Sequence, residues 1–347
     1  MSSMTGLVNF AKDPDSVELR ELPVPEIGSN DVLLHVDSVG ICGSDLHQYR
    51  GKHSWRVNYP VVLGHEFAGI IARCGPGVHG FKEGDRVTSE TAAALPHDSP
   101  LIRRGLYNLD PGRLGFGYGV DGAMATYVKV PGRCLHHLPA ELSLEKAALT
   151  EPCCVAYNAV NVNSRVHPGD SVAIIGPGPI GLLCAMMAKL SGAGHLLVIG
   201  TAVDAKRLAV ATQLGADTVL GANGEDVAAW VKDFSDGYGI DLVIDAAGVS
   251  ASLKLALEIV RPAGQITKVG WGPQPLGFSL DPLVQKAVTL QGSFSHNWPI
   301  WEKVIFLLAT GKIDLGKILN RVAPLSDWHA SFEEMESGAI VKGVLKP

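Results

Sequence analysis

The chain has 347 residues, of which 46% are apolar and 18% charged, and its formal net charge is −6. This length and apolar share allow two folded domains with full cores. The sequence has no basic stripe of the kind that binds nucleic acid, and its apolar runs are too short to span a bilayer. Residues 1–5 lack a secretory signal pattern, and the six cysteines do not form a disulfide framework. We therefore expect a cytoplasmic protein without nucleic-acid or membrane partners.

Residues 1 to about 150 have the pattern of short strands separated by turns. Residues 32–36 and 69–72 are candidate strands, and 75–77 and 82–85 are candidate turns. The pattern predicts a mainly antiparallel β domain that is partly closed on itself. Residues 90–120 are rich in glycine, proline and polar groups, so we expect a long loop there.

From Pro168 onward, apolar strand patterns alternate with helical ones. This alternation predicts a parallel sheet with right-handed crossovers, a doubly wound α/β domain. The expected strands are 171–175, 196–199, 218–220, 241–244 and 265–269, and the clearest helices are 180–191 and 205–214. The tail from about residue 292, including 301–310, reads as helix and strand that return to the first domain.

Cys42, His65 and Glu66 form the first chemical signal. A thiolate, an imidazole and a carboxylate suit zinc in a site that keeps one position open for water or a substrate oxygen. Alone, the cysteine would be a structural residue and the histidine a core residue. Glu151 is a candidate fourth ligand, direct or through water. Asp45 is placed to accept the second N–H of a ligand imidazole, and a helix-capping role is compatible with this.

The second signal is the turn from Gly176 to Gly181, with glycines at 176, 178 and 181. It follows an apolar strand and opens a helix, where backbone N–H groups and the helix dipole bind a pyrophosphate. Pro177 and Pro179 have no N–H, so the donors must come from other positions such as Ile180. Both signals in one chain predict a hydride-transferring enzyme that uses a metal to polarise an alcohol or carbonyl oxygen.

The end of the second strand leaves the choice of cofactor open. The acid that binds the ribose hydroxyls of NAD is expected there, but the strand runs into Gly200 and Thr201. Asp204 comes slightly later, and a helix-capping role is the simpler interpretation. Thr201, Lys206 and Arg207 could receive the 2′-phosphate of NADP, so both NAD and NADP stay possible cofactors.

On these motifs the chain resembles zinc-dependent medium-chain dehydrogenases of the alcohol dehydrogenase superfamily, in the sorbitol (polyol) and threonine dehydrogenase branch. The resemblance rests on the run from Gly40 to His47, on Gly64-His65-Glu66, Gly84-Asp85-Arg86-Val87 and Glu151-Pro152, and on the glycine turn. Glu151, where classical alcohol dehydrogenases have a cysteine ligand, points to the polyol branch. The resemblance implies a GroES-like catalytic domain over residues 1–154, a Rossmann dinucleotide-binding domain over 155–291, and a segment over 292–347 that returns to the catalytic domain.

The resemblance also implies roles for individual residues. Cys42 and His65 would bind zinc, with Glu66 and Glu151 bound directly or through water. Ser44 would accept the substrate hydroxyl proton, and His47 would relay it towards solvent, with Asp45 and Glu66 also in the catalytic set. The residues expected to contact the dinucleotide are Gly176, Gly178, Pro179, Ile180, Gly181, Gly200, Thr201, Arg207, Ala246, Val269, Ser293 and Phe294.

The chain departs from the family at a second, structural zinc site. The four positions where the family has cysteine ligands hold Pro96, Ser99, Ile102 and Asp110. Without thiolates a tetrahedral structural site cannot form, so we expect one zinc per chain. The loop would then be held by packing of Leu101, Ile102, Leu106 and Leu109.

The substrate implied by the resemblance is a secondary alcohol of a polyol or sugar, oxidised to a ketone. The candidates to line the cleft between the domains are Tyr49, Trp55, Phe116, Glu151, Trp271, Phe294 and His296. The alternatives are a threonine-type 3-hydroxy acid, which needs a cation for its carboxylate, and a protein that binds dinucleotide without turnover. The family also implies a homodimer or homotetramer through an edge strand at 289–294.

Overall fold

The computed structural model describes residues 3–221, 225–272 and 274–347. The chain forms two compact units. The first comprises Met1–Glu151 and His296–Pro347, and the second comprises Pro152–Ser295. The expected domain borders follow residues 154 and 291. Within the described ranges no helix is long and apolar enough to cross a membrane.

The first unit is mainly β. Its strands are β1 (Ser3–Asn9), β2 (Val17–Pro23), β3 (Asp31–Gly40), β4 (Val61–Val62), β5 (Glu66–Cys74), β6 (Arg86–Ser89), β7 (Tyr127–Pro131), β8 (Leu135–His137), β15 (Leu319–Pro324) and β16 (Lys342–Lys346). One sheet has the order β15-β16-β3-β5-β6-β8, with β7 also paired to β3, and a smaller sheet has the order β2-β1-β4. The β15–β16 pair is parallel, and the other pairs are antiparallel.

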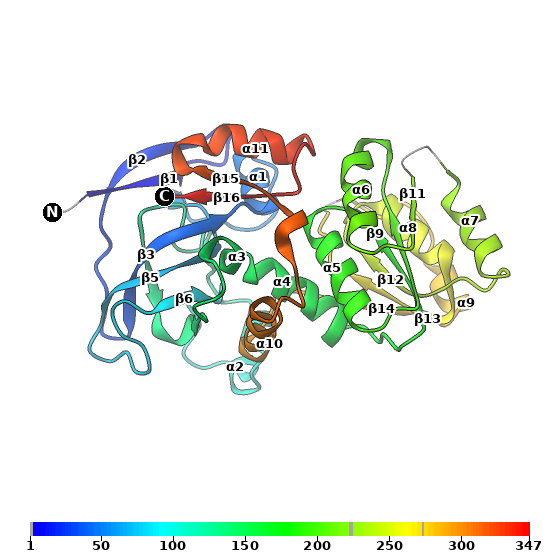
Figure 1. Ribbon diagram of the computed structural model, residues 1–347, viewed down its shortest axis with the longest axis horizontal. Helices are drawn as coiled ribbons and strands as arrows, with labels where there is room; N and C mark the ends of the chain where they lie inside the picture. Colours follow the sequence, from blue (N-terminus) through cyan, green and yellow to red (C-terminus); the bar gives the residue numbers. More distant parts are fainter. Residues whose placement is uncertain (1–2, 222–224, 273) are drawn as a thin grey trace. The chain divides into compact units, whose positions relative to one another are not determined.

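The helical segments of this unit are α1 (Gly43–Tyr49), α2 (Pro100–Arg103), η1 (Tyr107–Leu109), η2 (Gly132–Cys134), α3 (Leu144–Ala148), α10 (Trp298–Ala309), η5 (Leu315–Lys317), η6 (Leu325–Asp327) and α11 (Trp328–Glu336). Helix α4 (Thr150–Tyr157) begins in this unit and continues into the second. Figure 1 shows the red C-terminal strand β16 beside the blue strand β3, to which it is hydrogen-bonded. The C-terminal segment therefore completes the sheet that begins near the N-terminus. Its residues Phe332 and Leu345 share a core with Leu34 and Phe67.

The second unit is a doubly wound α/β domain, as the sequence predicts. Its strands are β9 (Ser171–Ile175), β10 (His195–Ile199), β11 (Thr218–Leu220), β12 (Ile240–Asp245), β13 (Val260–Lys268) and β14 (Thr289–Gly292). They form one parallel sheet in the order β11-β10-β9-β12-β13-β14. The order reverses between β9 and β12, and dinucleotides bind at this kind of switch point.

The helical segments of this unit are η3 (Asn158–Val162), α5 (Pro179–Leu190), η4 (Ala202–Asp204), α6 (Ala205–Gln213), α7 (Val227–Phe234), α8 (Ser250–Ile259) and α9 (Asp281–Gln285). Helix α5 packs against α6, and α7 and α9 pack against α8. Strand β9 is buried along Val172–Ile175, which explains its continuous apolar run. The α/β fold class is confirmed.

The loop at 90–120 contains the short segments α2 and η1, and polar contacts hold it. Ser99 Oγ donates a hydrogen bond to Asp110 Oδ2, and Asp110 Oδ1 accepts one from the Gly112 amide at 2.8 Å. Tyr107 Oη donates to Glu90 Oε2 at 2.5 Å. The expectation that Leu109 packs the loop is wrong, because this side chain is 45% exposed. Two of the positions where the family has cysteines are thus joined by a hydrogen bond.

Candidate active site

The first three expected zinc ligands lie together where β3 ends and β5 begins. Gly40, the last residue of β3, pairs with Glu66, the first residue of β5. The chain then turns at Cys42, the N-cap of α1, while His65 lies directly before β5. The ligand atoms of Cys42, His65 and Glu66 lie within 4.8 Å of one another. An antiparallel strand pair therefore assembles a potential metal site from two short sequence motifs.

A buried lysine holds Glu66. Lys342 Nζ, from β16, donates to Glu66 Oε1 at 2.7 Å and to the Ile41 carbonyl at 2.7 Å. Glu66 Oε2 is buried and has no hydrogen-bond partner. A Cβ on Gly40 would lie 2.2 Å from that oxygen, so glycine leaves the space that the carboxylate occupies. One oxygen of Glu66 is thus fixed, and the other is left to bind a further group.

Glu151 lies in the first turn of α4 and has a different partner. His296 Nε2 lies 2.9 Å from Glu151 Oε1, and the indole N–H of Trp301 donates to His296 Nδ1 at 2.8 Å. Glu151 does not belong to the close group formed by Cys42, His65 and Glu66. Whether it binds zinc directly or through water stays a prediction.

The electrostatics of the cluster favour a bound cation. Burial alone would lower the pKa of His65, but Cys42, Asp45 and Glu151 raise it well above its usual value. Burial raises the pKa of Asp45, and it also raises that of Glu66 despite the opposing effect of Lys342. The negative groups around His65 thus favour a positive charge at this position. The sulfur, nitrogen and oxygen donors of the cluster, with the unpartnered Glu66 Oε2, fit zinc.

The structure shows Asp45 in the capping role, while its predicted bond to a ligand imidazole stays a prediction. Asp45 Oδ2 accepts the backbone N–H of Cys42 at 2.8 Å, which fixes the start of α1, while Asp45 Oδ1 has no hydrogen-bond partner. Ser44 Oγ is also buried without a partner, and His47 is exposed. Ser44 thus has an unused hydroxyl on the turn that follows Cys42.

The residues expected to bind the dinucleotide lie along one edge of the parallel sheet. Five of them directly follow the ends of β9, β10, β12, β13 and β14, namely Gly176, Gly200, Ala246, Val269 and Ser293. Parallel strands end at the same edge, so these positions form a row at its carboxyl side. Phe294 continues this row and packs its ring against Trp271, with ring centroids 5.5 Å apart.

The three glycines of the turn differ in whether the fold requires a glycine at their position. Gly176 has a φ of +97°, and a Cβ on Gly181 would lie 1.9 Å from the Gly176 carbonyl oxygen. Gly178 has a φ of −70°, and a Cβ there would meet no atom within 4 Å. The fold therefore does not require glycine at 178, and the open space suits a phosphate group. Pro179 is the first residue of α5, so the amides of Ile180 and Gly181 have no acceptor within the helix.

Near Gly200, the carboxylate of Asp204 already accepts hydrogen bonds from within the protein. Asp204 Oδ2 accepts hydrogen bonds from the Thr201 amide at 3.0 Å and the Thr201 hydroxyl at 2.9 Å. Arg207 lies beside the same carboxylate, 3.9 Å from Asp204 Oδ1. A Cβ on Gly200 would lie only 3.0 Å from the Pro177 ring, so the position is crowded. Asp204 is thus a helix-start residue, and the choice between NAD and NADP stays open.

Two substrate-lining candidates are core residues instead. Phe116 is 1% exposed and packs edge-on against Phe67, and Tyr49 is 6% exposed with its hydroxyl 2.9 Å from His329 Nε2. The sequence also gave no sign of Lys342 or Trp301 as neighbours of the site. The only local signal for Lys342 is a lysine at the start of a short strand whose middle residues are apolar.

The comparisons with known proteins agree with this site and fold. Residues 28–140 match the alcohol dehydrogenase GroES-like domain, and residues 179–310 match the zinc-binding dehydrogenase domain. The chain is 36% identical over 345 residues to D-arabitol-phosphate dehydrogenase of Enterococcus avium, covering 99% of this chain and 97% of that protein. It is equally identical to sorbitol dehydrogenase of Halalkalibacterium halodurans, covering 99% of both. A solved structure from Sinorhizobium meliloti 1021, bound to NADP, covers 100% of both chains with a TM-score of 0.91 and 26% identity.

The fold and the site define an oxidoreductase with a dinucleotide-binding domain and a metal-binding β domain. The chain belongs to the zinc-binding dehydrogenase family, within the GroES-like alcohol dehydrogenases. It is an enzyme whose cofactors are zinc and NAD or NADP.

Proposed function

We propose that this enzyme transfers a hydride between a secondary alcohol of a polyol or sugar and NAD or NADP, with the alcohol oxidised to a ketone. The carrying observation is the polar cluster of half-buried Cys42 and His65 with buried Glu66, in the same unit as Glu151. The relatives that act on sorbitol and arabitol phosphate support this substrate class.

The residues would divide the work as follows. Zinc supplies a Lewis acid that makes a bound hydroxyl more acidic. Cys42, His65 and Glu66 would hold the metal, and Glu151 would bind it directly or through water. Ser44 Oγ, which is buried and unpartnered, would accept the substrate hydroxyl proton, and His47 would pass it to solvent. The Gly176–Gly181 turn would hold the pyrophosphate, which orients the nicotinamide for hydride transfer.

The test is a spectrophotometric assay for reduced nicotinamide. Zinc-loaded enzyme would be assayed with free polyols, polyol phosphates, sugars and threonine, each with NAD and with NADP. We expect turnover with a polyol or its phosphate, and its loss in Cys42→Ser. Turnover with threonine alone would move the enzyme to the 3-hydroxy acid dehydrogenases. Turnover with no member of the panel would overturn the proposed substrate class.

The proposed cellular setting is a cytoplasmic homo-oligomer. All six cysteines are free thiols, which suits a reducing compartment. Strand β14 is an edge of its sheet and is largely exposed, so it offers unpaired backbone groups to a second copy. Size-exclusion chromatography with light scattering would show a dimer or a tetramer, and a monomer would contradict the proposal.

A further inference from the structure

We propose that Trp301 and His296 are positioning residues that set the orientation of Glu151 toward the zinc. The proposal rests on the proposed function, in which Glu151 is part of the zinc site. The three side chains form a continuous hydrogen-bonded chain, with 2.8 Å between Trp301 Nε1 and His296 Nδ1 and 2.9 Å between His296 Nε2 and Glu151 Oε1. Nothing in the sequence pattern predicts this contact, because His296 and Trp301 are far from Glu151 along the chain.

The direction of the hydrogen bonds follows from the chemistry of the groups. An indole N–H can only donate, so His296 Nδ1 must be the acceptor. In a neutral imidazole the proton is then on Nε2, which donates it to Glu151 Oε1. Trp301 therefore selects the tautomer of His296 that binds a carboxylate. Trp301 is 0% exposed, His296 2% and Glu151 8%, so water competes little for these bonds.

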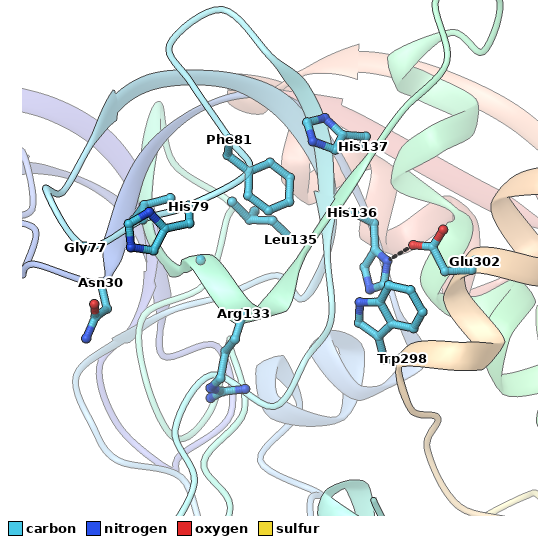
Figure 2. Close-up of a pocket in the computed structure, with 12 residues that line it drawn as sticks. Asn30, Gly77, His79, Phe81, Arg133, Leu135, His136, His137, Trp298 and Glu302 are labelled. Atoms are coloured by element: carbon cyan, nitrogen blue, oxygen red, sulfur yellow. Dashed lines mark hydrogen bonds and ion pairs between the residues drawn. The ribbon is translucent and has the colours of Figure 1, made fainter.

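The indole ring itself is held in place from its other side. Trp301 stacks on His136 with ring centroids 5.4 Å apart and an interplanar angle of 9°. His136 Nδ1 lies 2.5 Å from Glu302 Oε1, and Figure 2 shows this bond beside Trp298 at one wall of a hollow of about 600 Å³. Trp301 and Glu302 both belong to α10. This one helix therefore carries the indole ring that starts the hydrogen-bonded series and the carboxylate that binds His136.

The two glutamates of the site are held by different kinds of donor. Lys342 is positively charged and neutralises Glu66, whereas His296 offers Glu151 a neutral N–H. The neutral donor fixes the direction of the Glu151 carboxylate without cancelling its charge. Oε1 is engaged, which leaves Oε2 for the metal or its water. Partners of this kind change metal affinity by about 10- to 100-fold when they are removed.

The test measures zinc release to a chelator and the visible spectrum of the cobalt-substituted enzyme, neither of which needs a substrate. We expect Trp301→Phe and His296→Phe to release zinc about tenfold faster and to change the cobalt spectrum. His296→Gln retains an N–H donor and should stay near the wild type. The double variant Trp301→Phe with His296→Phe should be no faster than His296→Phe alone, because both act through one bond.

The control is Trp328→Phe, the same substitution in the same unit, outside the site, and it should leave both signals unchanged. If Trp301→Phe does not fold, the comparison of His296→Phe with His296→Gln still decides the matter. Any of three results would overturn this inference while leaving the proposed function intact. They are a wild-type rate of zinc release from Trp301→Phe, a double variant whose acceleration is the product of the two single effects, and equal rates of release from His296→Phe and His296→Gln. A wild-type protein that binds no zinc would overturn the proposed function and the inference with it.

Discussion

Lys342 Nζ lies 2.7 Å from Glu66 Oε1, with side-chain exposures of 3% and 1%, although 276 positions separate the two residues. Removing one partner of a buried ion pair leaves an uncompensated charge and costs about 3–5 kcal/mol. We therefore expect Lys342→Met to lower the free energy of unfolding of the zinc-free protein by about that amount in urea denaturation.

The matched control is Lys346→Met in the same strand. Lys346 pairs with Asp37 and Glu145, but its side chain is 34% exposed. Solvent screening limits the expected loss there to about 1 kcal/mol. The double variant Lys342→Met with Glu66→Gln should be more stable than Lys342→Met alone, since it removes the stranded charge. Equal losses in the two lysine variants would contradict this account.

Gly178 and Gly181 should separate cofactor binding from folding. Alanine at 178 meets open space at an ordinary φ, so Gly178→Ala should keep the wild-type melting temperature. It should weaken dinucleotide binding by roughly tenfold or more, about 1.4 kcal/mol or above, because the methyl group occupies the phosphate space. Gly181→Ala should lower the melting temperature, because its Cβ would lie 1.9 Å from a carbonyl oxygen. Fluorescence titration with reduced cofactor and thermal unfolding measure the two effects. Unchanged cofactor affinity in Gly178→Ala would refute the assignment of that space.

The loop at 90–120 should hold without metal. Elemental analysis of the purified enzyme should find one zinc per chain, and Cys42→Ser should remove it.

Ser99→Ala breaks the bond to the buried Asp110 and should cost about 1–3 kcal/mol of stability, whereas Ser337→Ala at an exposed position should cost little. Two zinc ions per chain, or a Ser99→Ala variant as stable as Ser337→Ala, would disagree with this picture.

Asp241 should make the second unit sensitive to acid. Although burial acts in the opposite direction, hydrogen bonds from Ser171 and the charge of Arg261 lower the pKa of Asp241 below its ordinary value of 3.8. A lowered folded-state pKa stabilises the fold above the unfolded value, and the effect is lost as the pH falls through the folded value. Asp241→Asn should thus be less stable than the wild type at pH 7 by about 1–2 kcal/mol.

The difference in free energy of unfolding between Asp241→Asn and the wild type should narrow as the pH falls below about 4, because the wild-type carboxylate then becomes protonated. Asp233→Asn, at an exposed position of α7, is the control and should be as stable as the wild type at every pH. Thermal unfolding over a pH series gives both curves. A gap between Asp241→Asn and the wild type that stays constant down to pH 3 would rule out this explanation.

The sequence predicted the parts of the molecule that depend on short-range patterns. The strand 171–175, the glycine turn and the helix after it come from one continuous segment, and apolar periodicity with three glycines is enough to identify them. Cys42, His65 and Glu66 were also found from local motifs, because each motif is a short continuous run with a recognisable set of ligand types.

The contacts missed are those that only the tertiary fold creates. Lys342 reaches Glu66 because β16 joins β3, and no pattern near residue 342 encodes that pairing. The bond between His296 and Glu151 also joins distant positions, 145 apart in the sequence. In the loop, Ser99 and Asp110 look like ordinary turn residues, so apolar packing was the simpler expectation. Phe116 and Tyr49 could not be separated from cleft residues, since aromatic side chains serve both roles.

The pairing of Lys342 with Glu66 also sets an order of events during synthesis. A ribosome that adds about 5–20 residues per second needs roughly 15–55 s to make the 276 positions between them. During that interval the cysteine, histidine and glutamate of the metal cluster already exist, but the ammonium group that balances the glutamate does not. The ion pair at the metal cluster can therefore form only after β16 has been made, late in the synthesis of this unit.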